Sequence, residues 1–577
     1  MTFRSLPQMF IESCRAHAER DCWLVREGEG YRGIPYAEAE RRVASCAARL
    51  RLLGVEKGDR IAIMAENSVE WATLDWAILS VGAITVPIYP TLPAHEAGII
   101  LRDSEARFAF GGSEKLCALL GREECESRVL PMSGITPSSP WSGVGREGFD
   151  QRVDLEAWRE RALKTNADDV ASLIYTSGTT GEPKGVVLTH RAFSFLCDAI
   201  VEQLPVDATD RFCSFLPLSH VYERMAGHFL PVSCGASIAY ARSPKTLADD
   251  IRAAAPTILL TVPRFLESVK SRIEASAGHG LRKWLFDKTV ALGRTRLENN
   301  LNPTGLLGLV LDRLVGKKVR ARLGGRVRFL VSGGAALPPE LAEFYGAFGI
   351  LILQGYGLTE TAPVISVNYP DRSVYRSAGE VLEGIEVRIA EDGEILVRGP
   401  SLMDGYFNKP DATKEAIDEE GWFHTGDIGY LEGRRIFITD RKKDIIVLLN
   451  GKNVSPAKIE GILKTQASIA ECMVVGDGSD HVSALIIPRV EFFAAEAKEH
   501  GISLNDRQAF VSAPFVQKRV REDVARANQS LPDFEKVKAF RLIPDEWTIE
   551  GGELTPSMKV KRRVVRERYA DLIAEMR

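Results

Sequence analysis

The segment from Tyr175 to Gly185, with the sequence YTSGTTGEPKG, combines the residue types that bind a polyphosphate. Its glycines let the backbone approach an anion closely and present N–H groups to it. Lys184 adds a positive charge, and four hydroxyl side chains add donors: Thr176, Ser177, Thr179 and Thr180. The segment is not the P-loop of NTPases, because Gly185 follows the lysine. A flexible linker is the simpler alternative, which the embedded Pro-Lys-Gly and the flanking apolar strands disfavour.

Four later segments also place charged or aromatic side chains among small residues. They are Gln354–Thr361 (QGYGLTET), Gly421–Asp427 (GWFHTGD), Asp440–Asp444 (DRKKD) and Pro556–Arg562 (PSMKVKR). Each has an ordinary structural interpretation when taken alone. Glu360 would be a solvated acid, Tyr356 a core residue and Asp427 the cap of a turn, while Arg441 would belong to a solvated basic run.

Together and in this order, the five segments resemble the signature motifs of the adenylate-forming (AMP-dependent) synthetases. That superfamily includes acyl-CoA synthetases, firefly-type luciferases and the adenylation domains of peptide synthetases. The resemblance extends from about the first third of the chain to its last residues, and five ordered motifs are far more specific than one. It implies that a carboxylic acid is activated with ATP and Mg²⁺ through an acyl-adenylate, and then transferred to coenzyme A.

The resemblance assigns nucleotide-binding roles in the larger part of the chain. Residues Thr176 to Lys184, with Gly178 and Gly181, would cradle the β- and γ-phosphates. Thr359 would contact the α-phosphate, and Glu360 would hold Mg²⁺, a hard cation that prefers oxygen ligands. Tyr356 would stack on adenine. The remaining residues implied at the nucleotide are Gln354, Gly355 and Gly357, together with Gly333 and Gly334, whose backbone would also approach the acyl carbonyl.

The later motifs are assigned to the ribose and to a hinge. Asp427 would accept hydrogen bonds from both ribose hydroxyls, as a carboxylate can, and Arg441 would also reach the ribose. Lys443 would be the hinge about which a small C-terminal domain rotates between the two half-reactions. After this rotation Gly451 would let the pantetheine of CoA pass, although an ordinary turn glycine is an alternative.

Lys559 is implied to bridge the carboxylate and the α-phosphate during adenylation, a task that suits a long, mobile cation. Many relatives have glycine before this lysine, where this chain has Met558, and that departure resembles the long-chain fatty acyl branch. Lys561 lies two residues away and stays an alternative. Lys559 is preferred because Arg562 then occupies the place of the family's arginine.

Short apolar runs alternate with helical patterns in the first part of the chain, which predicts an α/β fold with mostly parallel sheets. Strands are expected at 61–65 and 83–89, with a helix over 69–82 between them. Further strands are expected at 171–175, 258–261 and 327–331. These elements must place the motifs at the ends of strands.

The character of the chain changes near Asp440, where a charged segment leads into a smaller region. That region contains an apolar run at 445–449, which predicts a strand, and a helical pattern around 515–527, which predicts a helix. We predict a large ATP- and acyl-binding domain over 1–439, a hinge at 440–444 and a small, mobile α+β domain over 445–577. The small domain would carry the adenylation lysine and the CoA-facing loop.

Composition excludes several other classes of protein. The chain has 577 residues, a formal net charge of −4 and 45% hydrophobic residues, so it is expected to be globular and not to bind nucleic acid. Its nine cysteines show no metal or disulfide pattern, which is typical of reduced thiols in the cytoplasm. No signal peptide or bilayer-spanning run is recognisable. The protein is expected to be soluble, or peripheral at the inner membrane surface.

Two regions bear on the acid. Leu216–Arg224 (LPLSHVYER) and Gly552–Pro556 resemble the motifs of long-chain acyl-CoA synthetases, which would put His220 near the acyl and thiol sites. Residues 278–325 contain two helical patterns with apolar faces, followed by a basic cluster. The region 280–328 could rest on an anionic membrane, or it could be a helical insertion packed on its own domain.

The leading hypothesis is a long-chain fatty acid:CoA ligase that forms AMP and pyrophosphate. One alternative is a fatty acyl-AMP ligase that loads a carrier protein. An alternative of another class is a catalytically silent acyl- or nucleotide-binding protein, which the presence of Lys184, Glu360, Asp427 and Lys559 disfavours. Chain length is left open, as is oligomeric state, for which monomer and homodimer are both considered.

Overall fold

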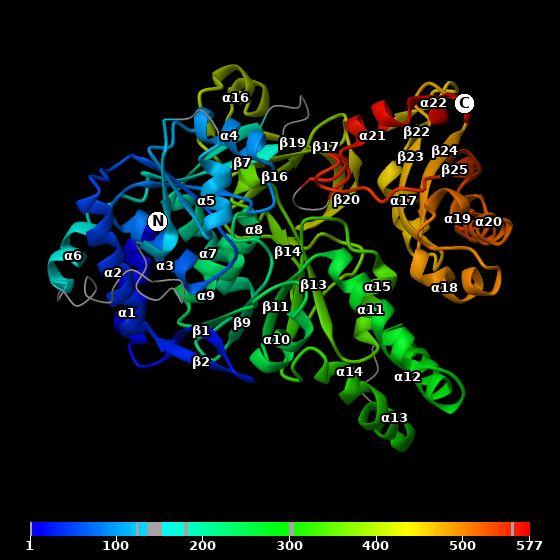
Figure 1. Ribbon diagram of the computed structural model, residues 1–577, viewed down its shortest axis with the longest axis horizontal. Helices are drawn as coiled ribbons and strands as arrows, with labels where there is room; N and C mark the ends of the chain where they lie inside the picture. The colour runs from blue at the N-terminus through cyan, green and yellow to red at the C-terminus, as the bar shows by residue number, and fades with distance from the viewer. Residues whose placement is uncertain (1–2, 123–125, 135–152, 178–182, 299–304, 556–558) are drawn as a thin grey trace. The chain divides into compact units, whose positions relative to one another are not determined.

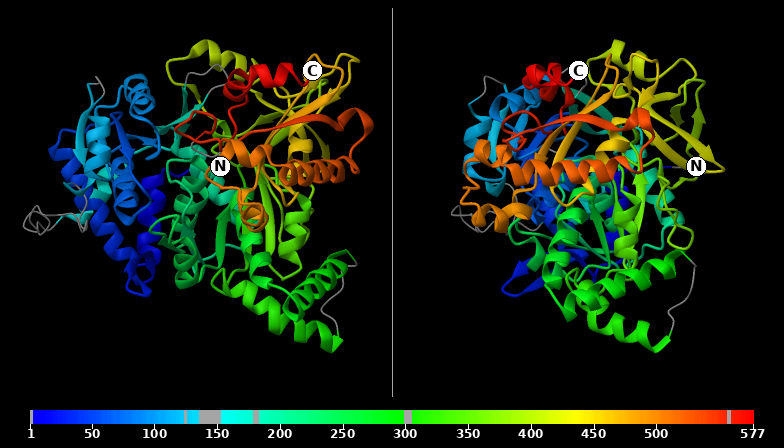
Figure 2. Two further views of the ribbon diagram at one scale, coloured as in Figure 1. Left: turned by 45° about the vertical axis from the view of Figure 1, so that its right-hand side comes forward. Right: turned by 90° about the vertical axis from the view of Figure 1, so that its right-hand side faces the viewer.

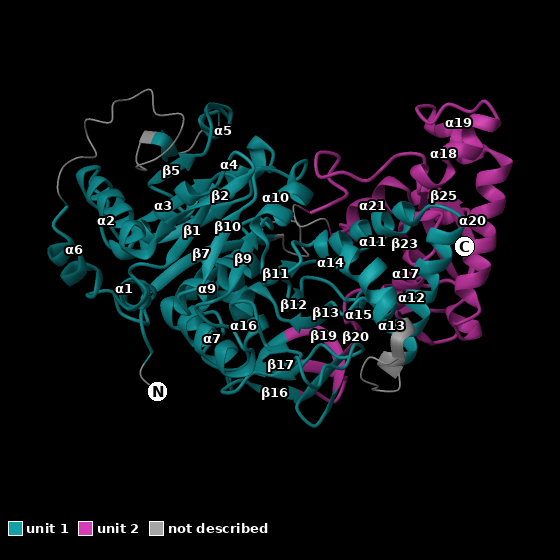
Figure 3. Cartoon of the chain, turned by 90° about the horizontal axis from the view of Figure 1, so that it is seen from below, with its two compact units in different colours: residues 1–388, 396–424, 431–437 teal, residues 389–395, 425–430, 438–577 magenta. Residues whose placement is uncertain are grey.

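A computed structural model of the chain describes residues 3–122, 126–134, 153–177, 183–298, 305–555 and 559–577. These residues form two compact units, coloured separately in Figure 3. Unit 1 comprises residues 1–388, 396–424 and 431–437, and unit 2 comprises 389–395, 425–430 and 438–577. Four strands contribute residues to both units: β16 (Glu386–Ile389), β17 (Glu394–Arg398), β19 (Phe423–Glu432) and β20 (Arg435–Arg441). The domain boundaries placed at 439 and 445 stay a prediction.

Unit 1 contains a seven-stranded sheet with the strand order β18-β8-β7-β4-β3-β5-β6. Its central strands are parallel, and a hairpin of β7 and β8 adds an antiparallel edge. The strands are β3 (Arg60–Met64), β4 (Ile84–Ile88), β5 (Phe108–Gly111), β6 (Arg128–Pro131), β7 (Val170–Ser177), β8 (Pro183–Thr189) and β18 (Gly405–Tyr406). Helix α3 (Val69–Ser80) connects β3 to β4 and is buried along almost its whole length. Its Ser68 side chain accepts a hydrogen bond from the N–H of Trp71 and so caps the helix.

A second, thirteen-stranded sheet includes nine strands of unit 1 in the order β15-β14-β13-β12-β11-β9-β10-β1-β2. The strands from β13 to β1 run parallel, whereas β14, β15 and β2 pair antiparallel with their neighbours. Their bounds are β1 (Asp21–Glu27), β2 (Gly30–Pro35), β9 (Arg211–Ser214), β10 (Ser237–Tyr240), β11 (Ile258–Thr261), β12 (Phe329–Ser332), β13 (Leu351–Tyr356), β14 (Ser366–Val367) and β15 (Glu380–Val381). Because parallel strands end at one edge, the residues that follow β11, β12 and β13 are brought together there.

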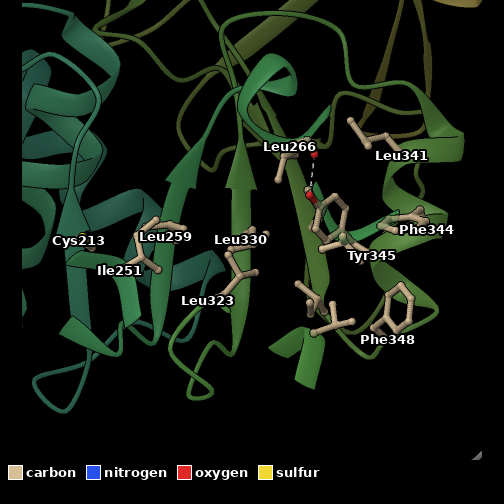
Figure 4. Packing of buried hydrophobic residues seen from close by; sticks show 14 of the residues in the cluster. Cys213, Ile251, Leu259, Leu266, Leu323, Leu330, Leu341, Phe344, Tyr345 and Phe348 are labelled. Atoms are coloured by element: carbon tan, nitrogen blue, oxygen red, sulfur yellow. Dashed lines mark hydrogen bonds between the residues drawn. The ribbon is translucent and has the colours of Figure 1, made fainter. Parts of the chain in front are cut away.

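The core of this sheet is packed against helices on the side seen in Figure 4. Leu259 and Leu330 project from the strands, while Phe344, Tyr345 and Phe348 come from helix α15 (Pro339–Gly346) and the turn after it. The buried Tyr345 hydroxyl donates a 2.6 Å hydrogen bond to the carbonyl of Leu266 in α11 (Pro263–Ala277). That bond satisfies a polar group that burial would otherwise penalise.

Further helices cover unit 1. They are α1 (Leu6–Ala16), α2 (Tyr36–Leu52), α4 (Ala94–Asp103), α5 (Glu114–Leu120), α6 (Leu155–Ala162), α7 (His190–Gln203), α9 (Leu230–Ser233), α10 (Leu247–Ala254) and α16 (Pro410–Ala416). After α11, helices α12 (Leu281–Glu298) and α13 (Gly305–Leu311) lie side by side and extend from the rest of unit 1 in Figures 1 and 2. A π-helical turn (Asp312–Gly316) and α14 (Lys317–Ala321) return the chain to β12.

Unit 2 has an α+β core around a three-stranded sheet of β23 (Ile469–Val475), β24 (Val482–Pro488) and β25 (Val537–Leu542). A small hairpin, β21 (Ile446–Val447) and β22 (Asn453–Val454), precedes it. The helices are α17 (Pro456–Lys464), α18 (Val490–Glu499), α19 (Arg507–Ser512), α20 (Pro514–Asn528), α21 (Arg562–Arg568) and α22 (Ala570–Ala574). Apolar residues from α17, α20 and the sheet form one buried cluster.

The predicted α/β fold class is confirmed, with a separate C-terminal α+β region. No helix within the described ranges has the length and apolar character needed to cross a membrane. Eight cysteines lie in those ranges and all are free thiols, whereas Cys125 lies outside them.

Candidate functional site

The glycine-rich segment is held by the β7–β8 hairpin of unit 1. Thr176 pairs with Lys184 across the two strands, and Ser177 pairs with Pro183. A Cβ added at Gly185 would lie 2.9 Å from the Tyr175 ring, so the close packing of this ring requires glycine. Residues 178–182, between the two strands, lie outside the described residues, and the predicted phosphate contacts of Gly178, Thr179, Thr180 and Gly181 fall there.

Three side chains from distant parts of unit 1 meet beside this hairpin. Tyr406 of β18 donates a 2.8 Å hydrogen bond from its hydroxyl to Oε1 of Glu360. The Nζ of Lys184 lies 4.8 Å from the centroid of the Tyr406 ring, within the range of a cation–π contact. Strand β18 pairs with β8, which carries the tyrosine to the lysine. The structure thus brings together Lys184 and Glu360, two of the predicted residues, through a tyrosine that sequence reasoning missed.

The carboxyl ends of β12 and β13 bring a second group of predicted residues together. Ser332 is the register partner of Gln354, so Gly333 and Gly334 follow β12 at the edge where Tyr356 ends β13. Gly334 has a φ of +79°, a conformation that favours glycine. A Cβ at Gly357 would lie 1.8 Å from the carbonyl oxygen of Pro363, so only glycine fits there.

The chain then turns sharply after this edge. Gly355 pairs with Val367 of β14, and Thr359 begins a short 3₁₀ helix, Thr359–Thr361, that also contains Glu360. The side chain and the backbone of Thr361 both bond with Leu358, which fixes the start of this turn. The carboxylate of Glu360 is thereby carried on a hydrogen-bonded turn rather than on a free loop.

The segment with His220 packs against the glycines that follow β12. The Nδ1 of half-buried His220 accepts a 3.1 Å hydrogen bond from the N–H of Tyr222, and the Tyr222 hydroxyl donates to the carbonyl of Val331 at 3.0 Å. A Cβ at Gly333 would lie 3.1 Å from the Tyr222 ring. Tyr222 therefore packs against Gly333 and bonds to the strand that precedes it, and sequence reasoning assigned it no role.

Glu223 is a carboxyl group in the interior of unit 1. It is buried on helix α8 (Val221–Arg224) with its Oε1 close to Gly227. Burial raises the pKa of Glu223 to about 8, although a hydrogen bond with Ser214 opposes the rise. A free glutamate has a pKa of 4.5, so the folded protein retains this proton across a range in which the unfolded chain loses it. The contribution of this group to stability is therefore lost as the pH rises from 4.5 to about 8.

We expect Glu223→Gln to flatten this pH dependence. The free energy of unfolding of the wild type should fall by about 1–3 kcal/mol between about pH 5.5 and 7.5 relative to that of the variant, because glutamine has no proton to lose. Urea titrations at a series of pH values measure the difference. Glu202→Gln, at an exposed glutamate of the same unit, is the matched control and should keep the wild-type slope. A wild-type slope in Glu223→Gln would contradict the raised pKa.

Asp427 and Arg441, the two residues predicted to bind the ribose, both lie in unit 2. The Nε of Arg441 donates a 2.8 Å hydrogen bond to Oδ1 of Asp427, which is buried, whereas the arginine side chain is half-exposed. Asp427 is fixed further by its N–H, which donates to Oγ1 of Thr425. Lys443 lies two residues after Arg441 and is exposed. Its hinge role stays a prediction.

The other predicted residues of unit 2 are Gly451 and Lys559. Gly451 closes the β21–β22 hairpin with a φ of +76° and an N–H bonded to the carbonyl of Leu448. Turn geometry alone thus explains this glycine. Exposed Lys559 contacts Thr555 through its backbone: the N–H of Lys559 donates to Oγ1 of Thr555 at 3.0 Å, and its carbonyl accepts from the N–H of Thr555. Residues 556–558 of the same motif lie outside the described residues. Arg562, three residues further on, donates a 2.6 Å hydrogen bond from its Nη1 to Oε1 of Glu460.

The parallel sheets of unit 1, the glycines at their carboxyl edge and the separate C-terminal unit form the framework on which the predicted site residues lie. The chain belongs to the AMP-binding enzyme family, because the model of that family matches residues 10–407 and the model of its C-terminal domain matches residues 443–577. The resemblance inferred from the five motifs is confirmed.

Relatives match the chain along most of its length. The long-chain-fatty-acid–CoA ligase FadD15 of Mycobacterium bovis is 37% identical over 93% of this chain and 91% of its own. The peroxisomal long chain acyl-CoA synthetase 6 of Arabidopsis thaliana is 32% identical over 95% and 82%. Among solved structures, the anthranilate CoA ligase AuaEII in complex with anthranoyl-AMP shares the fold with a TM-score of 0.73, covering 98% of both chains at 18% identity.

Proposed function

We propose that this protein is a long-chain fatty acid:CoA ligase that forms AMP and pyrophosphate. The observation that carries the proposal is the match, at 37% identity over 93% of the chain, to a relative named for this activity. The joint position of Lys184, Tyr406 and Glu360 beside the β7–β8 hairpin supports the use of ATP, because a cation and a carboxylate side by side suit a phosphate–metal complex.

The first half-reaction joins the fatty acid to AMP. A carboxylate oxygen attacks the α-phosphorus of ATP, the bond from that phosphorus to the bridging oxygen breaks, and pyrophosphate leaves. Both reactants are anions, so the site must supply positive charge and oriented donors. Lys184 and the glycine-rich segment would neutralise the β- and γ-phosphates, Thr359 would contact the α-phosphate, and Lys559 would approach the oxygen atoms that react.

The second half-reaction transfers the acyl group to CoA. The thiolate sulfur attacks the acyl carbon, and the bond to the AMP oxygen breaks, so that acyl-CoA and AMP are formed. Asp427 and Arg441 would hold the ribose during both steps, with the carboxylate kept in place by its 2.8 Å bond to the arginine. His220 would lie near the acyl group. The hinge at Lys443 and the CoA-facing role of Gly451 are parts of the same proposal.

The described residues also suit Mg²⁺. Among the described residues, no group of three or more His, Cys, Asp or Glu side chains could hold a metal ion with protein ligands alone. Mg²⁺ in ATP-dependent sites takes most of its ligands from phosphate and water, with one or two carboxylates. Glu360, steadied by the Tyr406 hydroxyl, is the residue that would supply a carboxylate. The ion would neutralise phosphate charge.

Tyr406→Phe tests this arrangement. The variant keeps the ring that faces Lys184 but removes the hydroxyl bonded to Glu360. A hydrogen bond to a charged group contributes about 1.5–3 kcal/mol, so we expect kcat/KM for ATP to fall about 10- to 100-fold, with a higher Mg²⁺ concentration needed for half-maximal rate. Initial rates over a grid of ATP and Mg²⁺ concentrations measure both. An unchanged Mg²⁺ dependence would count against the role of Tyr406.

The activity itself is tested with purified protein, ATP, Mg²⁺ and a series of fatty acids of increasing chain length, with and without CoA. Mass spectrometry should identify acyl-CoA and AMP, with a maximum at long chains. Accumulation of acyl-AMP that does not react with CoA would instead indicate a ligase that loads a carrier protein. Absence of any adenylate and of any pyrophosphate would leave only a silent binding protein.

The proposal includes the source of the acid. Long-chain fatty acids partition into bilayers, where each buried methylene contributes about 0.8 kcal/mol, so an enzyme that uses them benefits from contact with a membrane surface. Residues 280–328 would provide this contact. The cytoplasmic location predicted from the thiols, and the choice between monomer and homodimer, stay predictions.

A further inference from the structure

Helix α12 has two opposite faces with different surroundings. On one face the ring of Phe286 packs against Phe344 and Phe348, and a Cβ added at Gly293 would lie 2.5 Å from Ala347. The opposite face carries Leu281, Trp284 and Leu292, of which the first two are 71% and 51% exposed. A packed helix needs one apolar face, so the second face is left without an explanation from the fold of unit 1.

A second exposed apolar strip follows on the neighbouring helix. Leu309 and Val310 of α13 and Leu314 of the π-helical turn are exposed, with Leu309 at 60%. Helix α13 and the π-helical turn both contact α12. In Figures 1 and 2 these elements are the green helices that extend from the body of unit 1. Six large apolar side chains on adjacent helices exceed the scattered single residues that are normal on a surface.

The same stretch of chain is strongly basic. Residues 281–328 contain twelve Lys or Arg and three Asp or Glu, a formal charge of +9 in a chain whose net charge is −4. Two of the basic side chains form ion pairs within the stretch, Lys283 with Asp287 and Arg320 with Asp312. Across the described part of the chain, no ion pair joins an acidic side chain to the exposed residues Arg313, Lys317 or Lys318.

We infer that the exposed faces of α12, α13 and the π-helical turn, together with Arg313, Lys317 and Lys318, form a docking surface for an anionic lipid bilayer. The apolar side chains would lie below the lipid headgroups, and the basic side chains would lie among the lipid phosphates, as in other interfacial helices. Trp284 suits this boundary, because its ring is apolar and its N–H is polar.

A second copy of the chain fits this surface less well. Two copies related by a two-fold axis would bring two segments of +9 charge against each other, which Coulomb repulsion opposes. The described helices are also too polar to cross a bilayer, so contact by lying on the surface is the arrangement that agrees with their composition. The biological purpose of the contact, delivery of fatty acid from the bilayer, rests on the proposed function, whereas the lipid binding does not.

Vesicle flotation with the full chain tests the inference without any assay of activity. Vesicles of phosphatidylcholine with about 30% phosphatidylglycerol should carry the protein to the top of the gradient, and vesicles of phosphatidylcholine alone should not. Raising the salt to about 0.5 M should release it, because the Debye length then falls to a few ångströms.

Two sets of substitutions separate charge from apolar contact. Each basic residue near an anionic surface contributes about 1 kcal/mol, so Arg313→Gln, Lys317→Gln and Lys318→Gln combined should weaken binding about 100-fold. The matched control combines Lys498→Gln, Lys518→Gln and Arg521→Gln at exposed positions of unit 2 and should bind like the wild type. Trp284→Ser with Leu309→Ser should weaken binding about 10-fold or more, through lost apolar burial.

The remaining outcomes overturn the inference. Equal binding to both kinds of vesicle, or equal effects of the two triple substitutions, would exclude a specific basic surface. Self-association in sedimentation experiments that disappears in Trp284→Ser with Leu309→Ser, without vesicle binding, would assign the surface to a second copy. If vesicles bind but no fatty acid is activated, the proposed function fails and the lipid surface stands. If fatty acid is activated and vesicles do not bind, the surface fails alone.

Discussion

Lys559→Ala should reduce the formation of acyl-adenylate by at least about 100-fold, because removing one charged donor at the reacting oxygen atoms commonly costs two to three orders of magnitude. The loss should be confined to the first half-reaction. Chemically prepared acyl-adenylate should still react with CoA at close to the wild-type rate, since no attack on the α-phosphorus remains to be assisted. Pyrophosphate release measures the first step, and acyl-CoA formed from the prepared adenylate measures the second.

Lys561→Ala is the matched control for this experiment. The N–H of Lys561 bonds to the carbonyl of Glu553, and alanine keeps that backbone contact. The contacts between Thr555 and residue 559 should also survive Lys559→Ala, because residue 559 makes them with its backbone, and the Arg562–Glu460 ion pair does not involve the lysine side chain. A loss of adenylation in Lys561→Ala with normal adenylation in Lys559→Ala would reverse the assignment of the two lysines. Equal loss of both half-reactions in Lys559→Ala would show that this residue has no role specific to adenylation.

The sequence predicted the regular elements best where an apolar run coincides with one buried strand. The run at 258–261 is strand β11, and the run at 327–331 overlaps β12 (Phe329–Ser332). The apolar run at 445–449 predicts one continuous strand, but only Ile446–Val447 pairs with a neighbouring strand. The carbonyl of Leu448 instead accepts the N–H of Gly451 in a turn, so apolar composition extended beyond the strand.

The candidate site shows a second limit of prediction from the sequence. Lys184 and Glu360 could be selected from their motifs, because each lies among glycine and hydroxyl residues that suit a nucleotide. Tyr406 joins them only through pairing of β18 with β8, across more than two hundred residues of sequence. A two-residue strand carries no periodic signal, and no local pattern encodes such a partner. Tyr222 was missed for a related reason, since its contacts with Val331 and Gly333 are also long-range.

The motif at Leu216–Arg224 shows how a resemblance to a substrate motif can conceal a structural role. Arg224 is fully buried and donates to both carboxylate oxygens of Asp75, from Nε at 2.9 Å and from Nη2 at 2.6 Å. Its Nη1 also donates to Ser172 of β7, and Thr85 of β4 donates to Asp75. The arginine therefore joins helix α8 to helix α3 and to two strands of the seven-stranded sheet.

The charge on Asp75 depends on this arginine. Burial alone would raise the pKa of Asp75, but Arg224 and His228 outweigh burial and lower it to about 2. Because the folded pKa lies below the ordinary value of 3.8, the stability that this group contributes is present above pH 3.8 and is lost as the pH falls toward about 2. Without the arginine, burial should raise the pKa of Asp75. The buried carboxylate would then be neutral only when it binds a proton.

Arg224→Met should therefore lower the free energy of unfolding of unit 1 by about 3–5 kcal/mol at neutral pH, the usual cost of leaving one charge of a buried pair unpaired. Urea titration of the full chain measures the loss, with the transition of each unit followed separately because the chain need not unfold in one step. Arg252→Met, at an exposed ion pair with Asp249 in the same unit, should cost less than about 1 kcal/mol.

The pH dependence distinguishes an unpaired charge from simple loss of packing. The cost of Arg224→Met should shrink between about pH 7 and pH 5, because Asp75 can then take up the proton that replaces its missing partner. Adding Asp75→Asn should recover part of the loss at neutral pH, since an amide carries no charge to bury. A cost that is the same at both pH values and is not reduced by Asp75→Asn would mean that Arg224 contributes through its contacts with the Trp71, Phe193 and Phe229 rings rather than through the ion pair.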